Sequence, residues 1–123
     1  MTRDDIATEL VDTLRRDGET AELWHLYSPD VVSVEARAGF PPGEPRVAMG
    51  ITDLKARHKR HAEAAELVSL EIGGPFPHGD THFALHLKAS SRDRETNELG
   101  EIEEIAVYQV ANGAIVREEF YYS

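Results

Sequence analysis

The sequence predicts an α+β domain in which three N-terminal helices pack on one face of a strongly curved, mostly antiparallel sheet. The first observation is the order of hydrophobic patterns, which reads helix, helix, strand, helix and then four strands joined by short connections. The second is the pair Asn112-Gly113, the preferred centre of a two-residue type I′ turn, which predicts a C-terminal hairpin. The third is that three helices cannot cover both faces of such a sheet, so we expect them on one face.

Length and composition limit the class of protein. The chain has 123 residues, which suits a single domain over 1–123 with one core. Its 13 basic and 23 acidic residues give a net charge of −10, which argues against nucleic acid or an anionic membrane as partner. The absence of cysteine excludes disulfides, thiolate zinc sites and a cysteine nucleophile. Residues 1–5 contain no apolar leader segment and no apolar run approaches a membrane span, so we expect a cytoplasmic protein.

The first half of the chain contains the three expected helices and one strand. Apolar residues at helical spacing predict a helix over 6–14, and Gly18 is suited to end it. A second, short helix is expected after Thr20, and a strand over 31–36. Residues 37–46 are rich in Pro and Gly and predict a long loop, after which Gly50 opens a third helix over 51–65.

The second half is predicted to be strands. Residues 67–72 form the first, and 73–80 are expected to be a rigid, kinked loop because they hold three Gly and two Pro. Residues 81–90 alternate apolar and polar side chains, which is typical of a half-buried strand. A polar connection over 92–100 leads to the final hairpin.

An unbroken ladder from Asn112-Gly113 assigns residues of the hairpin to faces. It pairs Glu104 with Tyr121, Ala106 with Glu119 and Tyr108 with Arg117. One face then carries Glu104, Tyr108, Arg117, Glu119 and Tyr121. The other carries Ile105, Val107, Val116, Phe120 and Tyr122, with Glu103, Gln109 and Glu118 among them. The polar face either lines a cavity or meets solvent or a partner subunit, and both interpretations remain open.

Three segments of the sequence, together with the order of secondary-structure elements, resemble a known family. The segments are residues 26–32, 50–54 and 107–122. The combination looks like the SnoaL-like family of the nuclear transport factor 2-like fold, the cone-shaped fold of ketosteroid isomerases. The resemblance spans nearly the whole chain and implies the fold more specifically than any reaction, because members include isomerases, cyclases, dehydratases and non-catalytic binding modules.

The resemblance implies one catalytic position. The isomerases begin their first strand after a Tyr-x-x-Asp turn, which Tyr27 and Asp30 match, and carry the proton-moving carboxylate near the end of that strand. The matching residue here is Glu35. Two departures are visible: the first helix has no tyrosine, and the chain ends in Tyr121 and Tyr122 where the cyclases have an acid/base aspartate.

The remaining catalytic candidates come from the polar face of the hairpin. If this face lines a cavity, the repulsion between Glu104 and Glu119 makes one of them hold a proton, which places an acid beside a base. The phenols of Tyr108 and Tyr121 would then assist. If the face is exposed, Arg117 forms ordinary cross-strand ion pairs instead.

Histidines and aromatic residues are the ligand-binding candidates. His58 and His61 lie one helical turn apart, but no HExxH string or third ligand accompanies them, so we predict no metal site. His61 is expected to orient a ligand. Trp24 is a pocket or core residue, and Phe40 and Phe76 lie in Pro/Gly-rich segments, where rigid aromatic residues can cover a cavity.

The resulting hypothesis is proton-transfer chemistry on a small organic ligand, of isomerase, cyclase or dehydratase type, with no cofactor. The alternative is a non-catalytic binding or dimerisation module that uses the same pocket, or an adaptor with a filled interior. We also expect a homodimer, because the apolar face that carries Ile105 and Val107 is left uncovered by the helices.

Overall fold

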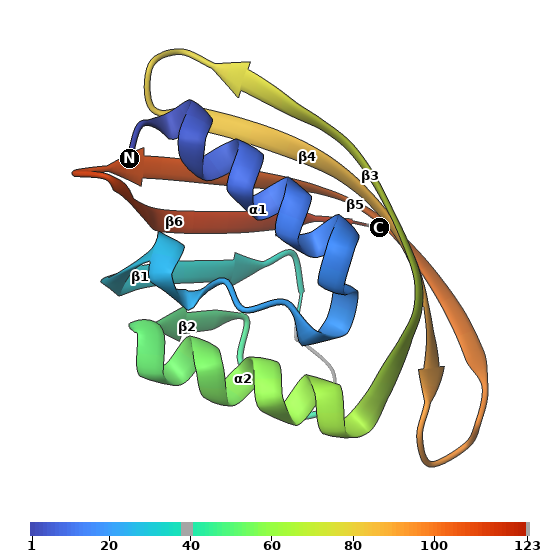
Figure 1. Ribbon diagram of the computed structural model, residues 1–123. Helices are drawn as coiled ribbons and strands as arrows, with labels where there is room; N and C mark the ends of the chain where they lie inside the picture. The colour runs from blue at the N-terminus through green and yellow to red at the C-terminus, as the bar shows by residue number, and fades with distance from the viewer. Residues whose placement is uncertain (38–40, 123) are drawn as a thin grey trace.

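The computed structural model describes residues 1–37 and 41–122. Two α-helices and one six-stranded sheet make up the domain (Figure 1). Their bounds are α1 Arg3–Asp17, β1 Tyr27–Glu35, β2 Val47–Met49, α2 Ile51–Ala64, β3 Ala65–His78, β4 His82–Asp93, β5 Leu99–Ala111 and β6 Ala114–Tyr121. Two 3₁₀ turns, η1 Gly18–Thr20 and η2 Trp24–Leu26, connect α1 to β1.

The sheet has the strand order β2-β1-β6-β5-β4-β3. Only β1 and β6 pair in parallel, and all other neighbours are antiparallel. The sheet curves, and both α-helices lie on its concave side, α1 over the β3–β6 half and α2 beside β1 and β2 (Figure 1). The predicted α+β class and the curved, mostly antiparallel sheet are therefore confirmed.

The prediction of three helices is wrong for the described chain, which contains two α-helices. The segment predicted as the second helix is reduced to η2, because so few residues cannot offset the cost of helix nucleation. The chain instead becomes extended at Tyr27, which pairs with Ile115 of β6. Neither α-helix combines the length and the apolar character that a membrane crossing requires.

Two strand boundaries also differ from the prediction. Val47–Met49, to which the sequence pattern assigns no element, pairs with β1 as a short edge strand. β3 continues to His78 within the predicted loop over 73–80, and its register shifts between Gly73 and Phe76. Because β3 is the other edge of the sheet, Pro75 and Pro77 break no ladder on a second side.

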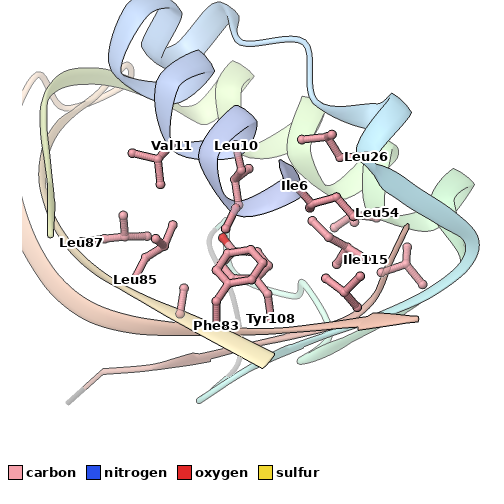
Figure 2. Close-up of a cluster of buried hydrophobic side chains, with 14 of the residues drawn as sticks. Ile6, Leu10, Val11, Leu26, Leu54, Phe83, Leu85, Leu87, Tyr108 and Ile115 are labelled. Atoms are coloured by element: carbon pink, nitrogen blue, oxygen red, sulfur yellow. The ribbon is translucent and has the colours of Figure 1, made fainter. Parts of the chain in front are cut away.

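The concave side is filled below α1 by the hydrophobic core. Ile6 and Leu10 of α1 point toward the sheet, where Phe83, Leu85 and Ile115 are fully buried (Figure 2). A capping box between Thr2 and Asp5 fixes the start of α1. Because α1 fills this half of the concave side with apolar side chains, the buried polar side chains lie in the other half, toward α2.

One irregularity in the β5–β6 hairpin decides which side chains reach the interior. Asn112 and Gly113 both have positive φ, and Ala111 pairs with Ala114 as predicted. The register then shifts between Gln109 and Val110, because β6 contains one extra residue at Val116.

Beyond this bulge the predicted pairing is wrong by one residue. Tyr108 lies opposite Glu118 and Ala106 lies opposite Phe120. Since side chains alternate between faces, the shift places Glu118 on the concave side and moves Glu119 and Tyr121 to the convex side.

Candidate functional site

The centre of the polar cluster is the carboxyl group of Glu118, which is 4% exposed. It accepts a hydrogen bond from the hydroxyl of Tyr27 at 2.8 Å and another from Ser33 at 3.0 Å. Parallel pairing of β1 with β6 places Ser33 directly beside Glu118. Burial raises the pKa of Glu118, and the two hydrogen bonds act in the opposite direction.

Arg57 brings a positive charge into this cluster from α2. Its side chain follows Leu54 by one helical turn and is buried. Nη2 donates a hydrogen bond to Ser33 Oγ at 2.5 Å and lies 3.7 Å from Glu35 Oε1. Nη1 is buried and has no hydrogen-bond partner in the structure. The guanidinium therefore connects Ser33 to Glu35 and keeps one donor unused.

Glu35 ends β1 at the edge of the cluster and is half-buried. The hydroxyl of Tyr122 donates a hydrogen bond to Glu35 Oε2 at 3.0 Å. Burial and the charge of Glu35 raise the pKa of Tyr122, so the phenol remains a hydrogen-bond donor. The guanidinium of Arg37 lies 5.1 Å from the centre of the Tyr122 ring and covers it.

Glu104 is the third carboxyl group of the cluster. It lies on β5 two residues before Ala106, on the concave side that it shares with Tyr108. Burial, and then the charges of Glu35 and Glu118, raise the pKa of Glu104 to about 7. At neutral pH this carboxyl group therefore exchanges its proton readily, beside a second carboxyl group.

The raised pKa makes a testable prediction about stability. Folded Glu104 binds its proton more tightly than the unfolded chain, so its contribution to stability is complete below pH 4.5 and is lost as pH rises toward about 7. We expect Glu104→Gln to raise the melting temperature at pH 8 relative to wild type and to have little effect at pH 4.5. Calorimetric melts at the two pH values measure this. Equal shifts at both would contradict it.

Three of the five predicted catalytic residues lie together on the concave side. These are Glu35, Glu104 and Tyr108, the last fully buried, stacked on Phe83 and raised in pKa by burial and by neighbouring carboxylates. Glu119 and Tyr121 do not join them, because the bulge at Val116 reverses the face of β6.

On the convex face these two residues form a separate network. Glu119 accepts hydrogen bonds from Tyr121 and from Arg117, and these bonds hold the pKa of Glu119 below its ordinary value. The structure therefore does not bring Glu119 and Tyr121 together with Glu104 and Tyr108.

The predicted ligand-binding residues are dispersed. Trp24 in η2 packs edge-on against His58, with ring centroids 5.5 Å apart, at the border of the core. His61 lies on the exposed side of α2. Phe76 is exposed and pairs with Ala84, whose neighbours face the core, so Phe76 lies on the convex face. Phe40 lies outside the described residues.

The sequence interpretation missed five residues of the cluster, namely Tyr27, Ser33, Arg57, Glu118 and Tyr122. A signal existed for Arg57, because it follows Leu54 by three residues on the buried side of the helix. Glu118 and Tyr122 were assigned to the apolar face by the unbroken ladder, and only the bulge corrects this.

A groove lies next to the cluster at Arg57. Its volume is about 260 Å³, and residues of α2, β2 and the segment 44–45 line it, among them Ala48, Asp53, Arg57 and Arg60. In residues 1–37 and 41–122 no three His, Asp or Glu side chains are grouped so that they would hold a metal ion. The groups that the described cluster brings together are carboxyl, phenol, hydroxyl and guanidinium groups.

Comparison with known proteins gives the family. Neither a protein-family model nor a curated protein matches the sequence. Among solved structures, a Mesorhizobium loti protein described as a SnoaL-like polyketide cyclase [carbohydrate phosphatase] is 31% identical, with a TM-score of 0.84, over 99% of this chain and 100% of that one. A Bacillus subtilis protein described as an isomerase is 19% identical, with a TM-score of 0.79, over 100% of this chain and 90% of that one.

A third structure, an NTF2-like protein from Burkholderia thailandensis, is 22% identical with a TM-score of 0.76. The match covers 100% of this chain and 92% of that chain. These structures share the curved sheet and its helices, which defines the class of protein as nuclear transport factor 2-like. The identity and full coverage of the Mesorhizobium loti match show that the chain belongs to the SnoaL-like family.

Proposed function

We propose that this protein transfers protons on a small organic substrate without a cofactor, in an isomerase, cyclase or dehydratase type of reaction. The observation that carries the proposal is the meeting of Glu35 and Glu104 on the concave side, where the pKa of Glu104 is about 7. General acid–base catalysis is most effective when the pKa of the catalytic group lies near the working pH.

The contacts suggest a role for each group. Glu35 is the proposed base, because it lies at the half-buried edge of the cluster, where a substrate can approach it. Glu104 is the proposed acid that returns the proton. Tyr122 orients Glu35 by its hydrogen bond. Tyr108 and Glu118 lie deeper and set the electrostatic environment of Glu104.

Proton exchange tests the proposal directly. Cyclohexanone and 3-methylcyclohex-2-enone are incubated with the protein in D₂O, and loss of the α-proton signals is followed by NMR. Catalysis by Glu104 as acid predicts a protein-dependent rate that falls as pH rises through about 7. Loss of the effect in Glu104→Gln supports the assignment. A rate equal to that of buffer for both compounds would count against it.

The filled interior favours a second candidate, a non-catalytic binding module. Below α1 the concave side is occupied by Leu10, Phe83 and Leu85, which leaves less room for a substrate than an open cone would. A module of this kind would bind a small ligand and release it unchanged. Binding of the two ketones without any exchange of their α-protons would select this function over proton transfer.

We also propose that the protein is a homodimer in the cytoplasm, formed through the convex face of the sheet. Phe120, expected on this face, is on the concave side. Ile105 is 42% exposed on the convex face as expected, and Tyr121, predicted on the opposite face, lies beside it and is 52% exposed. Val47 and Met49 of β2 extend the same surface, because their partners Val34 and Val32 alternate with buried residues of β1. This apolar surface supports a contact with a second copy.

Light scattering on a gel-filtration column tests the dimer. Wild type is expected to elute as a dimer at micromolar concentration, and Ile105→Lys as a monomer, because a buried unpaired charge opposes association. Val68→Lys is the matched control, since Val68 is an exposed apolar residue of the far edge strand β3. A monomeric wild-type protein would contradict the proposal.

A further inference from the structure

The guanidinium of Arg57 has one buried nitrogen atom that no described group of the protein satisfies. Arg57 is 9% exposed, and its Nη1 is buried without a hydrogen-bond partner in the structure. A buried charged donor without an acceptor is costly, and in native proteins such donors are rare. An acceptor that arrives with a ligand would satisfy it.

The contacts of the neighbouring nitrogen, Nη2, show where Nη1 lies relative to the carboxylate of Glu35. Nη1 and Nη2 belong to one planar group, and Nη2 already donates to Ser33 and faces Glu35. An oxygen atom bound to Nη1 is therefore held by the same planar group that faces Glu35 through Nη2. Arg57 is also one of the residues that line the groove of about 260 Å³.

The other arginine of the groove does not compete for this role. Arg60 donates from Nε and Nη2 to Glu44, so its fork is occupied by a carboxylate. Arg57 is held differently, because its contacts with Ser33 and Glu35 leave Nη1 buried and without a partner among the described residues.

The charges nearby select the kind of oxygen. Glu35 and Glu118 lie beside a single guanidinium, so their negative charge weakens the attraction of Arg57 for an anion without cancelling it. A neutral carbonyl compound carries no such penalty and becomes negative at its oxygen only during the reaction.

We propose that Nη1 of Arg57 binds the carbonyl oxygen of a neutral ketone or aldehyde substrate and stabilises the enolate formed when Glu35 takes the neighbouring proton. This inference rests on the proposed function. In the step, the C–H bond breaks, its electron pair forms the C=C bond, and the carbonyl π pair moves to oxygen. The proton passes to Glu35. The oxygen then re-forms the carbonyl group while the C=C electron pair takes a proton from Glu104, which gives an isomer when this proton is added at another carbon or on the other face. Transfer of the proton of Glu35 to Glu104 through solvent restores both groups. Donors aimed at a developing oxyanion stabilise the transition state more than the ground state.

The binding of 4-nitrophenol tests the role of Arg57 without any turnover. This probe is neutral when protonated, and it absorbs visible light as the phenolate, which imitates an enolate oxygen. Wild type at pH 6 is expected to give a saturable increase in phenolate absorbance. Arg57→Gln is expected to reduce the phenolate affinity about tenfold, as expected for loss of a hydrogen bond from a charged donor. Lys59→Gln removes the same charge from an exposed position of α2 and should change the affinity less than about twofold.

Further variants separate this inference from the proposed function. Arg57→Lys keeps the charge near Ser33 and Glu35 but lacks the second planar nitrogen, so we expect weaker binding with the fold retained, as checked by circular dichroism. Glu35→Gln should abolish α-proton exchange but retain or strengthen phenolate binding. Absence of saturable binding in wild type, or equal binding by wild type and both Arg57 variants, would overturn the inference. Binding that depends on Arg57 without any exchange would support Arg57 as the oxygen-binding group, and it would reject the proton-transfer function together with the enolate step.

Discussion

Glu118→Ala is expected to lower the free energy of unfolding by about 3 kcal/mol or more. The change removes the acceptor of Tyr27 and Ser33 and leaves two hydroxyl groups without their partner, at about 1–3 kcal/mol each. It also leaves a cavity beside Arg57. Denaturant unfolding followed by circular dichroism measures the loss. Glu118→Gln keeps one acceptor oxygen and is expected to lose less.

The neighbouring residue provides the matched control. Glu119→Ala removes a carboxyl group one position away, but its partners Arg117 and Tyr121 are on the convex face, so the loss should stay below about 1 kcal/mol. The comparison also tests the bulge at Val116, because an unbroken ladder would put Glu119 inside. A larger loss of stability from Glu119→Ala than from Glu118→Ala would show that the register of β5 against β6 is incorrect.

Glu35→Gln is expected to reduce α-proton exchange at least about 100-fold, since a glutamine cannot accept the proton that a general base removes. Its amide oxygen can still accept the hydrogen bond of Tyr122, so we expect the melting temperature to change little. NMR-detected exchange of cyclohexanone in D₂O gives the rate, and a thermal melt gives the stability.

Glu103→Gln is the control for this experiment. Glu103 is an exposed carboxylate of the same strand as Glu104, on the opposite face, where it lies 3.5 Å from His86. Its replacement should leave the exchange rate within about twofold of wild type. If Glu103→Gln and Glu35→Gln lower the rate equally, the general negative charge of the protein is responsible and Glu35 is not the base.

The features that could be predicted from the sequence depend on residues that lie close together in the chain. The turn at Asn112-Gly113 and the apolar face that contains Ile6 and Leu10 follow from short-range rules, and the structure has both. The resemblance to the SnoaL-like family predicted the curved sheet. Glu35 was carried over by resemblance, and its position beside Arg57 is consistent with the proposed site.

What could not be predicted depends on the packing of distant segments. No local signal marks Val116 as an extra residue, because valine is equally suited to a regular strand, yet it decides the face of everything after it. Arg57 belongs to the basic run 57–60, and the sequence favours a solvent-facing position for such a run because arginine is usually exposed. Its burial is tolerated because Ser33 and Glu35 lie at the guanidinium.

The parallel pairing of β1 with β6 has a consequence for how the protein is made. Tyr27 and Glu118 are 91 residues apart in the chain, so β1 leaves the ribosome long before its central neighbour exists. Until β6 is synthesised, the backbone N–H and C=O groups of β1 that face β6 have no strand to pair with. Because closing so long a loop is slow, we expect the carboxyl cluster to be completed late in folding. Chaperone dependence during synthesis should therefore be concentrated in the interval before β6 emerges.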